Sequence, residues 1–414
     1  MRPRLLCPMP MFMKPIVLAF ATLLLSLASP LSARAAERVT GPWDLAKLKQ
    51  TPTATWGERK GLVQEVFYEG EPFAGKPTRV FAYYSRPEKI DGKLPAMVCV
   101  HGGGGKAFAE WATLWAQRGY AAIAMDLAGV GAGGKRLPDG GPGQGDTEKF
   151  RVFTDAEAKE RWTYHAVAAV IRGHSLLASR PEVDAGRIGI TGISWGGYLT
   201  CIVTGLDDRL KVSVPVYGCG FLHENSVWLG QFAKLGPEQS AHWVKFFDPS
   251  VYLPGVSCPI LFLNSTTDFA YPLDSYQKCY RLVTAPVTLG ITPTLRHSHQ
   301  AGWAPVEIGL FADSVLRDGA SLPRLGAMQT TGDTASASCE SKAPITKAQL
   351  HFAKAEGVWQ KRSWTSVDAT IKGQEVSAKI PAAPRPLVYF LTVTDNRGAT
   401  VSTPHALLGD GGAK

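Results

Sequence analysis

Three stretches of the chain carry residue types that nucleophilic catalysis requires. The first is "GISWG", in which Ser194 stands between Gly192 and Gly196, directly after an apolar run and before a helix-like segment. In this context the pattern predicts a strained strand-to-helix turn that exposes the serine hydroxyl. The N–H of Trp195 would lie at the helix N-terminus and favour a developing negative charge. Ser194 is therefore the predicted nucleophile.

The second stretch is "HGGGG", His101 to Gly105, which follows another apolar run. Backbone without side chains approaches a substrate closely, so we expect the N–H groups of Gly103 and Gly104 to complete an oxyanion hole with Trp195. His101 is expected either to support this loop or to line the substrate pocket.

The third set comes from two loops that follow predicted strands. Asp268 lies in "STTDFAYP", and His297 and His299 lie in "LRHSHQAGW". An aspartate that orients a histidine, which in turn takes the serine proton, completes a triad. Asp274 is a rival acid, but it is expected to cap the next helix. We favour His299 as general base, because it is closer to the following helix, with His297 as the alternative.

The elements around these loops predict an α/β protein. An antiparallel strand pair over 62–70 and 78–87 is followed by strand–helix–strand units, which indicate a mostly parallel sheet over 36–325. An insert at about 218–254 is expected to roof the pocket. Its aromatic residues either form the pocket wall or pack inside the lid; the candidates are Trp228, Trp243 and Tyr252.

The composition of the chain changes after residue 325. Residues 326–343 are small and polar, as linkers are. Residues 344–407 alternate in short runs around a "DNRG" turn, which predicts a small β-sandwich domain.

The N-terminus predicts export. Residues 1–35 have basic residues, an apolar run and an A-x-A site, as a secretory signal peptide does, so we expect a secreted or periplasmic protein with no stable membrane span after cleavage. Cleavage removes four basic residues and lowers the net charge from +9 to +5. Because that charge is dispersed, no nucleic-acid partner is expected.

Seven cysteines are present, and no pair has C-x-x-C or metal-ligand spacing, so no metal is predicted. Disulfides are permitted in an exported protein. The expected bridge-forming residues are Cys219, Cys258 and Cys279.

Four stretches together carry a resemblance to a known family. "SRPEVDAGRIGITGISWGGY", "VHGGGG", "RGYAAIAMD" and "TDFAYP" resemble the acetylxylan esterase, dienelactone hydrolase and prolyl-oligopeptidase-like branch of the α/β-hydrolase superfamily, over about residues 60–320. The resemblance implies a sheet with helices on both faces, a serine hydrolase and no cofactor. Dienelactone hydrolases resemble the chain but have cysteine where Ser194 stands. Prolyl oligopeptidases carry a large N-terminal propeller, whereas about 60 residues of the expected mature chain precede the hydrolase core, so a gated peptidase is not expected.

The leading hypothesis is an exported ester hydrolase that works through an acyl-enzyme on a small-molecule or carbohydrate ester, with deacetylation of carbohydrate as one form. A serine peptidase acting on short peptides is an alternative. A carbohydrate-binding protein that keeps a hydrolase fold is another. The residues leave open the acyl group, the alcohol part and the oligomeric state.

Overall fold

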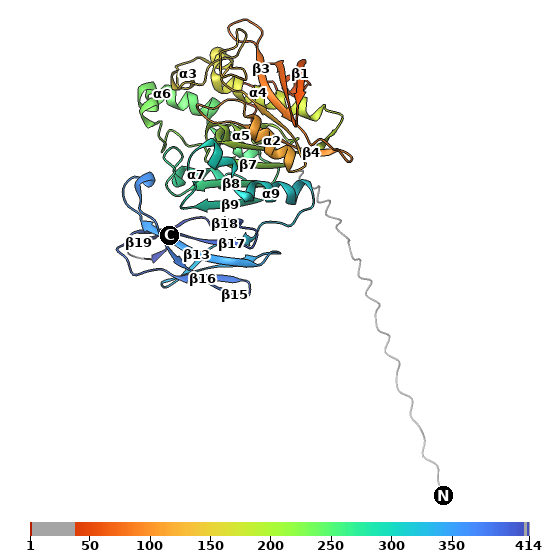
Figure 1. Ribbon diagram of the computed structural model, residues 1–414. Coiled ribbons are helices and arrows are strands. Elements are labelled where there is room, and N and C mark those ends of the chain that lie inside the picture. The colour runs from red at the N-terminus through yellow and green to blue at the C-terminus, as the bar shows by residue number, and fades with distance from the viewer. Residues whose placement is uncertain (2–37, 410–411, 414) are drawn as a thin grey trace. The chain divides into compact units, whose positions relative to one another are not determined.

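A nine-stranded sheet organises most of the chain in the computed structural model, which describes Met1, residues 38–409 and residues 412–413 (Figure 1). The strand order is β1-β2-β3-β5-β4-β6-β7-β8-β9. The strands are β1 (Ala54–Lys60), β2 (Val63–Glu69), β3 (Arg79–Ser85), β4 (Leu94–Val100), β5 (Ala121–Met125), β6 (Val183–Ile193), β7 (Val212–Val216), β8 (Ile260–Ser265) and β9 (Val287–Thr292). Apart from Met1, the predicted signal peptide lies outside the described residues.

Strand direction follows the hydrophobic patterns. β4, β5, β7 and β8 are buried at every position, as expected of strands covered on both faces. The neighbouring strands in the run β5-β4-β6-β7-β8-β9 all pair in parallel. β1, β2 and β3 are antiparallel, and β3 pairs antiparallel with β5. The predicted antiparallel pair and parallel sheet are therefore confirmed, and β1 adds a strand at the edge.

Helices cover both faces of this sheet. α4 and α5 pack against each other, while α2 lies on β5 and α9 on β6 and β7 (Figure 1). The helices are α1 (Leu45–Leu48), α2 (Ala109–Gln117), α3 (Asp146–Lys149), α4 (Trp162–Ala178), α5 (Trp195–Leu206), α6 (Leu229–Phe247, kinked at Gly236), α7 (Leu273–Tyr280), α8 (His299–Trp303) and α9 (Val306–Leu316). Among the described residues no helix is both long and apolar enough to span a bilayer.

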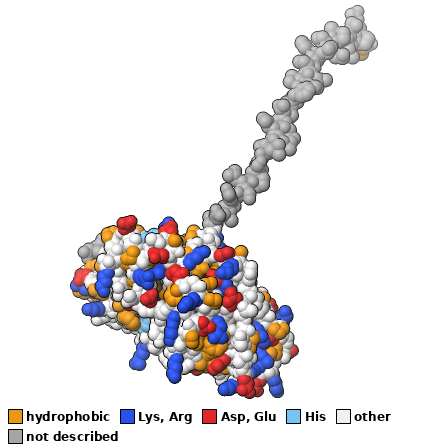
Figure 2. Space-filling view, turned by 90° about the horizontal axis from the view of Figure 1, so that it is seen from above, with side chains coloured by type: hydrophobic (Ala, Val, Ile, Leu, Met, Phe, Trp, Pro, Cys, Tyr) orange, Lys and Arg blue, Asp and Glu red, His pale blue; other side chains and the backbone are white. Residues whose placement is uncertain are grey.

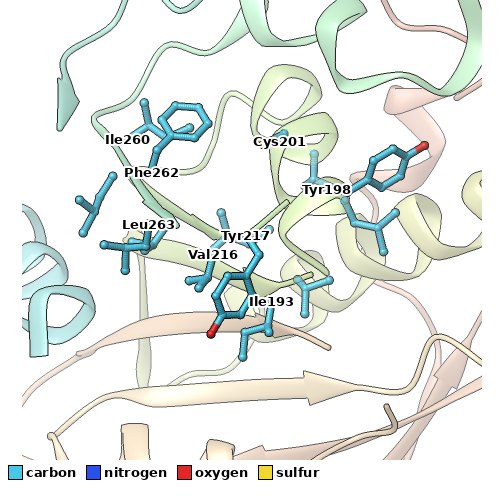
Figure 3. Close-up of a cluster of buried hydrophobic side chains, with 14 of the residues drawn as sticks. Ile193, Tyr198, Cys201, Val216, Tyr217, Ile260, Phe262 and Leu263 are labelled. Carbon is cyan, nitrogen blue, oxygen red and sulfur yellow. The ribbon is translucent and has the colours of Figure 1, made fainter. Parts of the chain in front are cut away.

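A buried apolar cluster supports the carboxyl ends of the central strands. Ile193, Val216 and Leu263, from three neighbouring parallel strands, lie close together beneath α5 (Figure 3). Tyr198 and Cys201, both on α5, are also fully buried, and the Tyr198 ring extends to the other side of the helix (Figure 3). The loops that leave these strands therefore start from a rigid, close-packed base.

Two antiparallel sheets form the C-terminal region. One contains β10 (Arg324–Leu325), β11 (Gln329–Thr331), β12 (Thr334–Glu340), β15 (Thr370–Lys372) and β16 (Glu375–Lys379). The other contains β13 (Ile345–Lys354), β14 (Thr365–Asp368), β17 (Leu387–Asp395), β18 (Thr400–Ser402), β19 (Ala406–Gly409) and β20 (Gly412–Ala413). β17 and β18 form the predicted hairpin. β18 also packs beside β9, where the Ile291 N–H donates to Ser402 Oγ at 3.1 Å.

The predicted linker over 326–343 is wrong, because β11 and β12 occupy most of it. In β12 the small apolar residues Ala335, Ala337 and Cys339 are buried, and the polar residues between them face outward. A strand with such small side chains has the composition of a linker but the period of a strand.

The expected disulfides are also not formed. Cys219, Cys258 and Cys279 are free and buried, as are the other three cysteines among the described residues. Burial raises the pKa of Cys219 and of Cys201, so these thiols are packing residues. On the face seen in Figure 2, basic and acidic side chains are interspersed.

Candidate active site

The turn at Ser194 has the strained geometry that its glycines predict. β6 ends at Ile193, Ser194 has φ 59° and ψ −121°, and α5 starts at the next residue. A non-glycine residue with positive φ is uncommon and is found where the surroundings enforce it. A Cβ on Gly196 would overlap the Val100 carbonyl, and a Cβ on Gly192 would overlap Gly196 itself. Both glycines are therefore required for the chain to turn here.

A continuous line of hydrogen bonds joins Ser194 to an imidazole and a carboxylate. The distance from His297 Nε2 to Ser194 Oγ is 2.9 Å, and the distance from His297 Nδ1 to Asp268 Oδ2 is 2.6 Å. Because a carboxylate only accepts, Nδ1 carries the proton and Nε2 is left to accept from the serine. Ser194 comes from the turn after β6, Asp268 from the loop after β8 and His297 from the loop after β9.

The carboxylate is itself held in place. The Asp268 side chain is fully buried, and its Oδ1 accepts the N–H groups of Ala270 at 2.9 Å and Tyr271 at 2.8 Å. Its Oδ2 is left for His297. Backbone donors therefore fix both the charge and the direction of the acid. The rival acid, Asp274, instead accepts from the side chain of Asn225 at 2.8 Å.

The preference for His299 over His297 is wrong in this structure. His299 is the first residue of α8, and its Nε2 accepts the Gly102 N–H at 3.1 Å. The two side chains therefore have different partners: His297, before α8, contacts Ser194 and Asp268, whereas His299, within α8, contacts Gly102. Burial lowers the pKa of His299, and the neighbouring His297 lowers it further, which favours the neutral ring that can accept from Gly102.

Aromatic rings that the sequence analysis missed confine His297. The Tyr217 ring stacks on it at 4.5 Å between centroids, and the Phe269 ring lies at 4.7 Å. Tyr217 follows β7 with φ 63°, and its hydroxyl donates to the Arg296 carbonyl. Tyr217 directly follows a predicted strand, and Phe269 is next to Asp268 in the loop after another predicted strand. Their positions at the carboxyl ends of the strands were the available signal.

The glycine loop lies beside the nucleophile as predicted. Gly103, Gly104, Ser194 and Trp195 line one cleft. A Cβ on Gly103 would lie 2.9 Å from Trp195 Cδ1, so the loop passes too close for a side chain. Trp195 starts α5, and its N–H therefore has no acceptor within the helix. These backbone donors are positioned beside the space above Ser194.

His101 supports the loop, and its assignment to the substrate pocket is wrong. The residue is 2% exposed, its Nδ1 lies 2.8 Å from the Gly102 carbonyl, and its Nε2 accepts the Leu127 N–H at 2.9 Å. Burial lowers the pKa of His101 to about 4. The neutral ring can therefore both donate and accept, and it links the glycine loop to the segment after β5.

Of the aromatic candidates in the insert, only Trp228 lines the cleft, where its ring lies 4.5 Å from that of Trp195. Trp243 and Tyr252 are each 1% exposed and pack inside the fold, Trp243 on Phe150 at 5.4 Å. Their assignment to the pocket is wrong: Trp243 lies on the buried face of α6, and Tyr252, which follows α6, packs on Trp43 at 5.5 Å.

The charged side chains of the cleft were also missed. They are Lys149 and Lys234, with Asp146 as the acidic residue. Lys149 and Asp146 belong to α3, at the end of the glycine-rich stretch after β5, and Lys234 belongs to α6. Within the described residues no three His, Cys, Asp or Glu side chains are grouped to hold a metal ion.

The sheet order and the strained Ser194 turn define the class of protein: an α/β-hydrolase. The acetyl xylan esterase of Paenibacillus sp. R4 has the same fold, with a TM-score of 0.54 and 22% identity over 66% of this chain and 92% of that chain. That of a Thermoanaerobacterium species has a TM-score of 0.53 and 18% identity over 66% and 94%. The predicted fold class is confirmed.

Sequence comparisons narrow the resemblance. Residues 61–249 match the acetyl xylan esterase family model, and residues 229–360 match that of the PhoPQ-activated pathogenicity-related protein. An acetyl esterase of Xylanibacter ruminicola is 24% identical over 242 residues, 53% of this chain and 52% of that protein. The chain therefore spans about half the length of this curated relative. The resemblance to the acetylxylan esterase-like branch is confirmed, and these relatives support a hydrolase.

Proposed function

We propose that the protein is a serine hydrolase that cleaves carboxylic esters through an acyl-enzyme, with Ser194, His297 and Asp268 as catalytic residues. The observation that carries the proposal is the line of hydrogen bonds from the buried carboxylate through the imidazole to a serine that faces an open cleft. A serine hydroxyl is a poor nucleophile unless a positioned base takes its proton.

In the first step Ser194 Oγ attacks the ester carbonyl carbon while its proton moves to His297 Nε2. The carbonyl oxygen becomes an oxyanion that accepts from the N–H of Trp195 and from Gly103 or Gly104. Collapse of this intermediate breaks the ester C–O bond, and His297 returns the proton to the leaving alcohol. Water, deprotonated by the same imidazole, then releases the acid and restores the Ser194 hydroxyl.

The substrate class we propose is an acetylated carbohydrate. Support comes from the match to the acetyl xylan esterase family model and from the acetyl esterase relative. The exposed ring of Phe269 and the ring of Trp228 border the cleft, where a sugar ring can stack. We further propose export, which the N-terminal pattern of residues 1–35 supports. Identification of the first residue of the mature protein by mass spectrometry tests it.

Labelling with a fluorophosphonate tests the nucleophile directly. The wild type should be labelled and should hydrolyse p-nitrophenyl acetate, whereas Ser194→Ala should do neither. Ser341→Ala, which changes an exposed serine in the C-terminal region, is the matched control and should behave as the wild type. An unlabelled wild type would contradict the proposal.

The substrate class needs a second comparison, of acetate release from acetylated xylan with cleavage of an aminoacyl p-nitroanilide. Release of acetate supports the esterase. Turnover of the anilide alone would replace it with a peptidase.

A further inference from the structure

A lysine lies in the wall of the same cleft, and the proposed reaction does not use it. Lys149 is the last residue of α3, its side chain is 3% exposed, and it borders the cleft together with Ser194. Its Nζ lies 4.4 Å from the centroid of the Trp195 ring, the residue that follows the nucleophile. The ammonium group is therefore buried at the reaction site and not on the outer surface.

This ammonium group has few partners for its three donors. Within the described residues its one hydrogen-bond acceptor is Asp146 Oδ1, at the long distance of 3.5 Å, and the Asp146 side chain is 45% exposed. The rings of Trp162, at 5.1 Å, and Trp195 supply cation–π contacts but no acceptor. A buried cation is costly unless it is paired, so an anion in the cleft would be stabilised here.

The surroundings favour an anion that also carries hydroxyl groups. Two of the three charged side chains that border the cleft are cations, Lys149 and Lys234. Gln144, also in the wall, donates from Nε2 to the Gly105 carbonyl at 3.0 Å, while its buried Oε1 has no partner among the described residues. A substrate hydroxyl that donates to this oxygen would satisfy it.

We propose that Lys149 determines specificity by binding a carboxylate of the substrate, so that the enzyme prefers esters bearing an anionic group near the scissile bond. This inference rests on the proposed ester hydrolysis and adds that the preferred ester carries an anionic group. The carboxylate belongs either to the acyl part, as in a dicarboxylic half-ester, or to the alcohol part, as in an acetylated uronic acid.

The experiment compares esters that differ in one carboxylate. For the acyl part, kcat and KM are measured with p-nitrophenyl propionate and with mono-p-nitrophenyl succinate. For the alcohol part, acetate release is measured from acetylated glucose and acetylated glucuronic acid. We expect the wild type to prefer the anionic member of at least one pair, and the pair that shows the preference identifies the source of the carboxylate.

Substitution of the lysine should remove that preference. Lys149→Met keeps the length of the side chain without its charge and should lower kcat/KM for the preferred anionic ester by about tenfold to a hundredfold, mainly through KM. The neutral ester should change by less than about threefold. Lys149→Arg should retain part of the preference. The matched control, Lys372→Met, removes an exposed cation of β15 that does not line the cleft and should have little effect.

Two results would overturn the inference. One is a wild type that hydrolyses both members of each pair equally well. The other is an equal loss of kcat on neutral and anionic esters in Lys149→Met, since that would make the lysine a support for the Trp195 ring. Both leave the fluorophosphonate labelling of Ser194 intact. Failure of the labelling itself would instead remove the proposed function on which this inference rests.

Discussion

Two aspartate–histidine pairs in this protein share nearly the same hydrogen bond and differ in their surroundings. His297 Nδ1 lies 2.6 Å from Asp268 Oδ2, and His174 Nδ1 lies 2.8 Å from Asp207 Oδ2. The His297 side chain is 15% exposed and its Nε2 reaches Ser194, whereas the His174 side chain is 1% exposed. The comparison teaches that the pair alone does not define an active site.

The partners of each carboxylate explain the difference. Arg209 donates to both oxygens of Asp207, at 2.8 Å and 2.7 Å, so the second pair belongs to a buried ion network between α4 and the end of α5. Asp268 receives backbone N–H groups instead, and its charge is directed at one imidazole. The first pair suits the proton transfer that we propose, and the second links α4 to the end of α5.

The largest expected effect is on kcat. His297→Ala should lower kcat for p-nitrophenyl acetate by about a thousandfold or more, because the base that takes the serine proton is lost. His174→Gln should keep kcat within about threefold in the folded fraction, because His174 does not contact the cleft. Steady-state kinetics checks both. Near wild-type turnover by His297→Ala would break the comparison.

Substitution of the two aspartates should affect different properties, kcat for Asp268 and stability for Asp207. Asp268→Asn should lower kcat by roughly a hundredfold or more, since the amide no longer holds the imidazole in the required tautomer. Asp207→Asn should leave kcat of the folded enzyme nearly unchanged and lower the free energy of unfolding by about 3 kcal/mol, because Arg209 loses its partner in a buried pair. Urea unfolding beside kinetics distinguishes them; a catalytic defect in Asp207→Asn alone would contradict the assignment.

The third prediction concerns His299, whose substitution should lower kcat less than substitution of His297. His299→Ala removes the acceptor of the Gly102 N–H and should lower kcat by about tenfold, because the glycine loop loses one of its contacts. His299→Gln, whose amide oxygen accepts at a similar position, should restore most of the loss, which a purely steric role would not explain. If His299→Ala proved as inactive as His297→Ala, the corrected order of the two histidines would be wrong.

The smallest effect is the pH dependence of stability. Burial lowers the pKa of His174, so its contribution is complete above its ordinary value of 6.5 and decreases as the pH falls through the lower folded value. Although burial raises the pKa of Asp207, hydrogen bonds from Arg209 and His174 lower it overall, and its contribution is lost only below about pH 4. Between pH 6.5 and 5, the Tm of the wild type should fall more than that of His174→Gln. Thermal melts of both proteins at the two pH values check this, and an equal fall in Tm would contradict the prediction.

Much of the site could be predicted because its backbone requirements leave a mark in the residues. Gly192 and Gly196 signal the turn at Ser194, since no side chain fits there, and the glycines after His101 signal a close backbone approach. Buried parallel strands appear as continuous apolar runs, so the fold class and the position of Asp268 after β8 followed from the pattern. The small residues of β12 obscured its strand period.

The choice between His297 and His299 could not be made in the same way. Both follow β9 in one short loop, and the difference between them is the direction of a side chain after the chain enters α8. Trp243 and Tyr252 were misplaced for a similar reason, because an aromatic residue suits a pocket wall and a buried core equally well.

The amino-acid sequence by itself determined which elements form and where the nucleophile, the glycine loop and the acid stand along the chain, because local backbone geometry and hydrophobic period depend on neighbouring residues. Only the tertiary structure decided which imidazole completes the line to Ser194, which aspartate–histidine pair is structural, and that Lys149 lies beside the nucleophile. Those outcomes depend on the directions of side chains from segments distant in sequence, and packing around the sheet sets these directions.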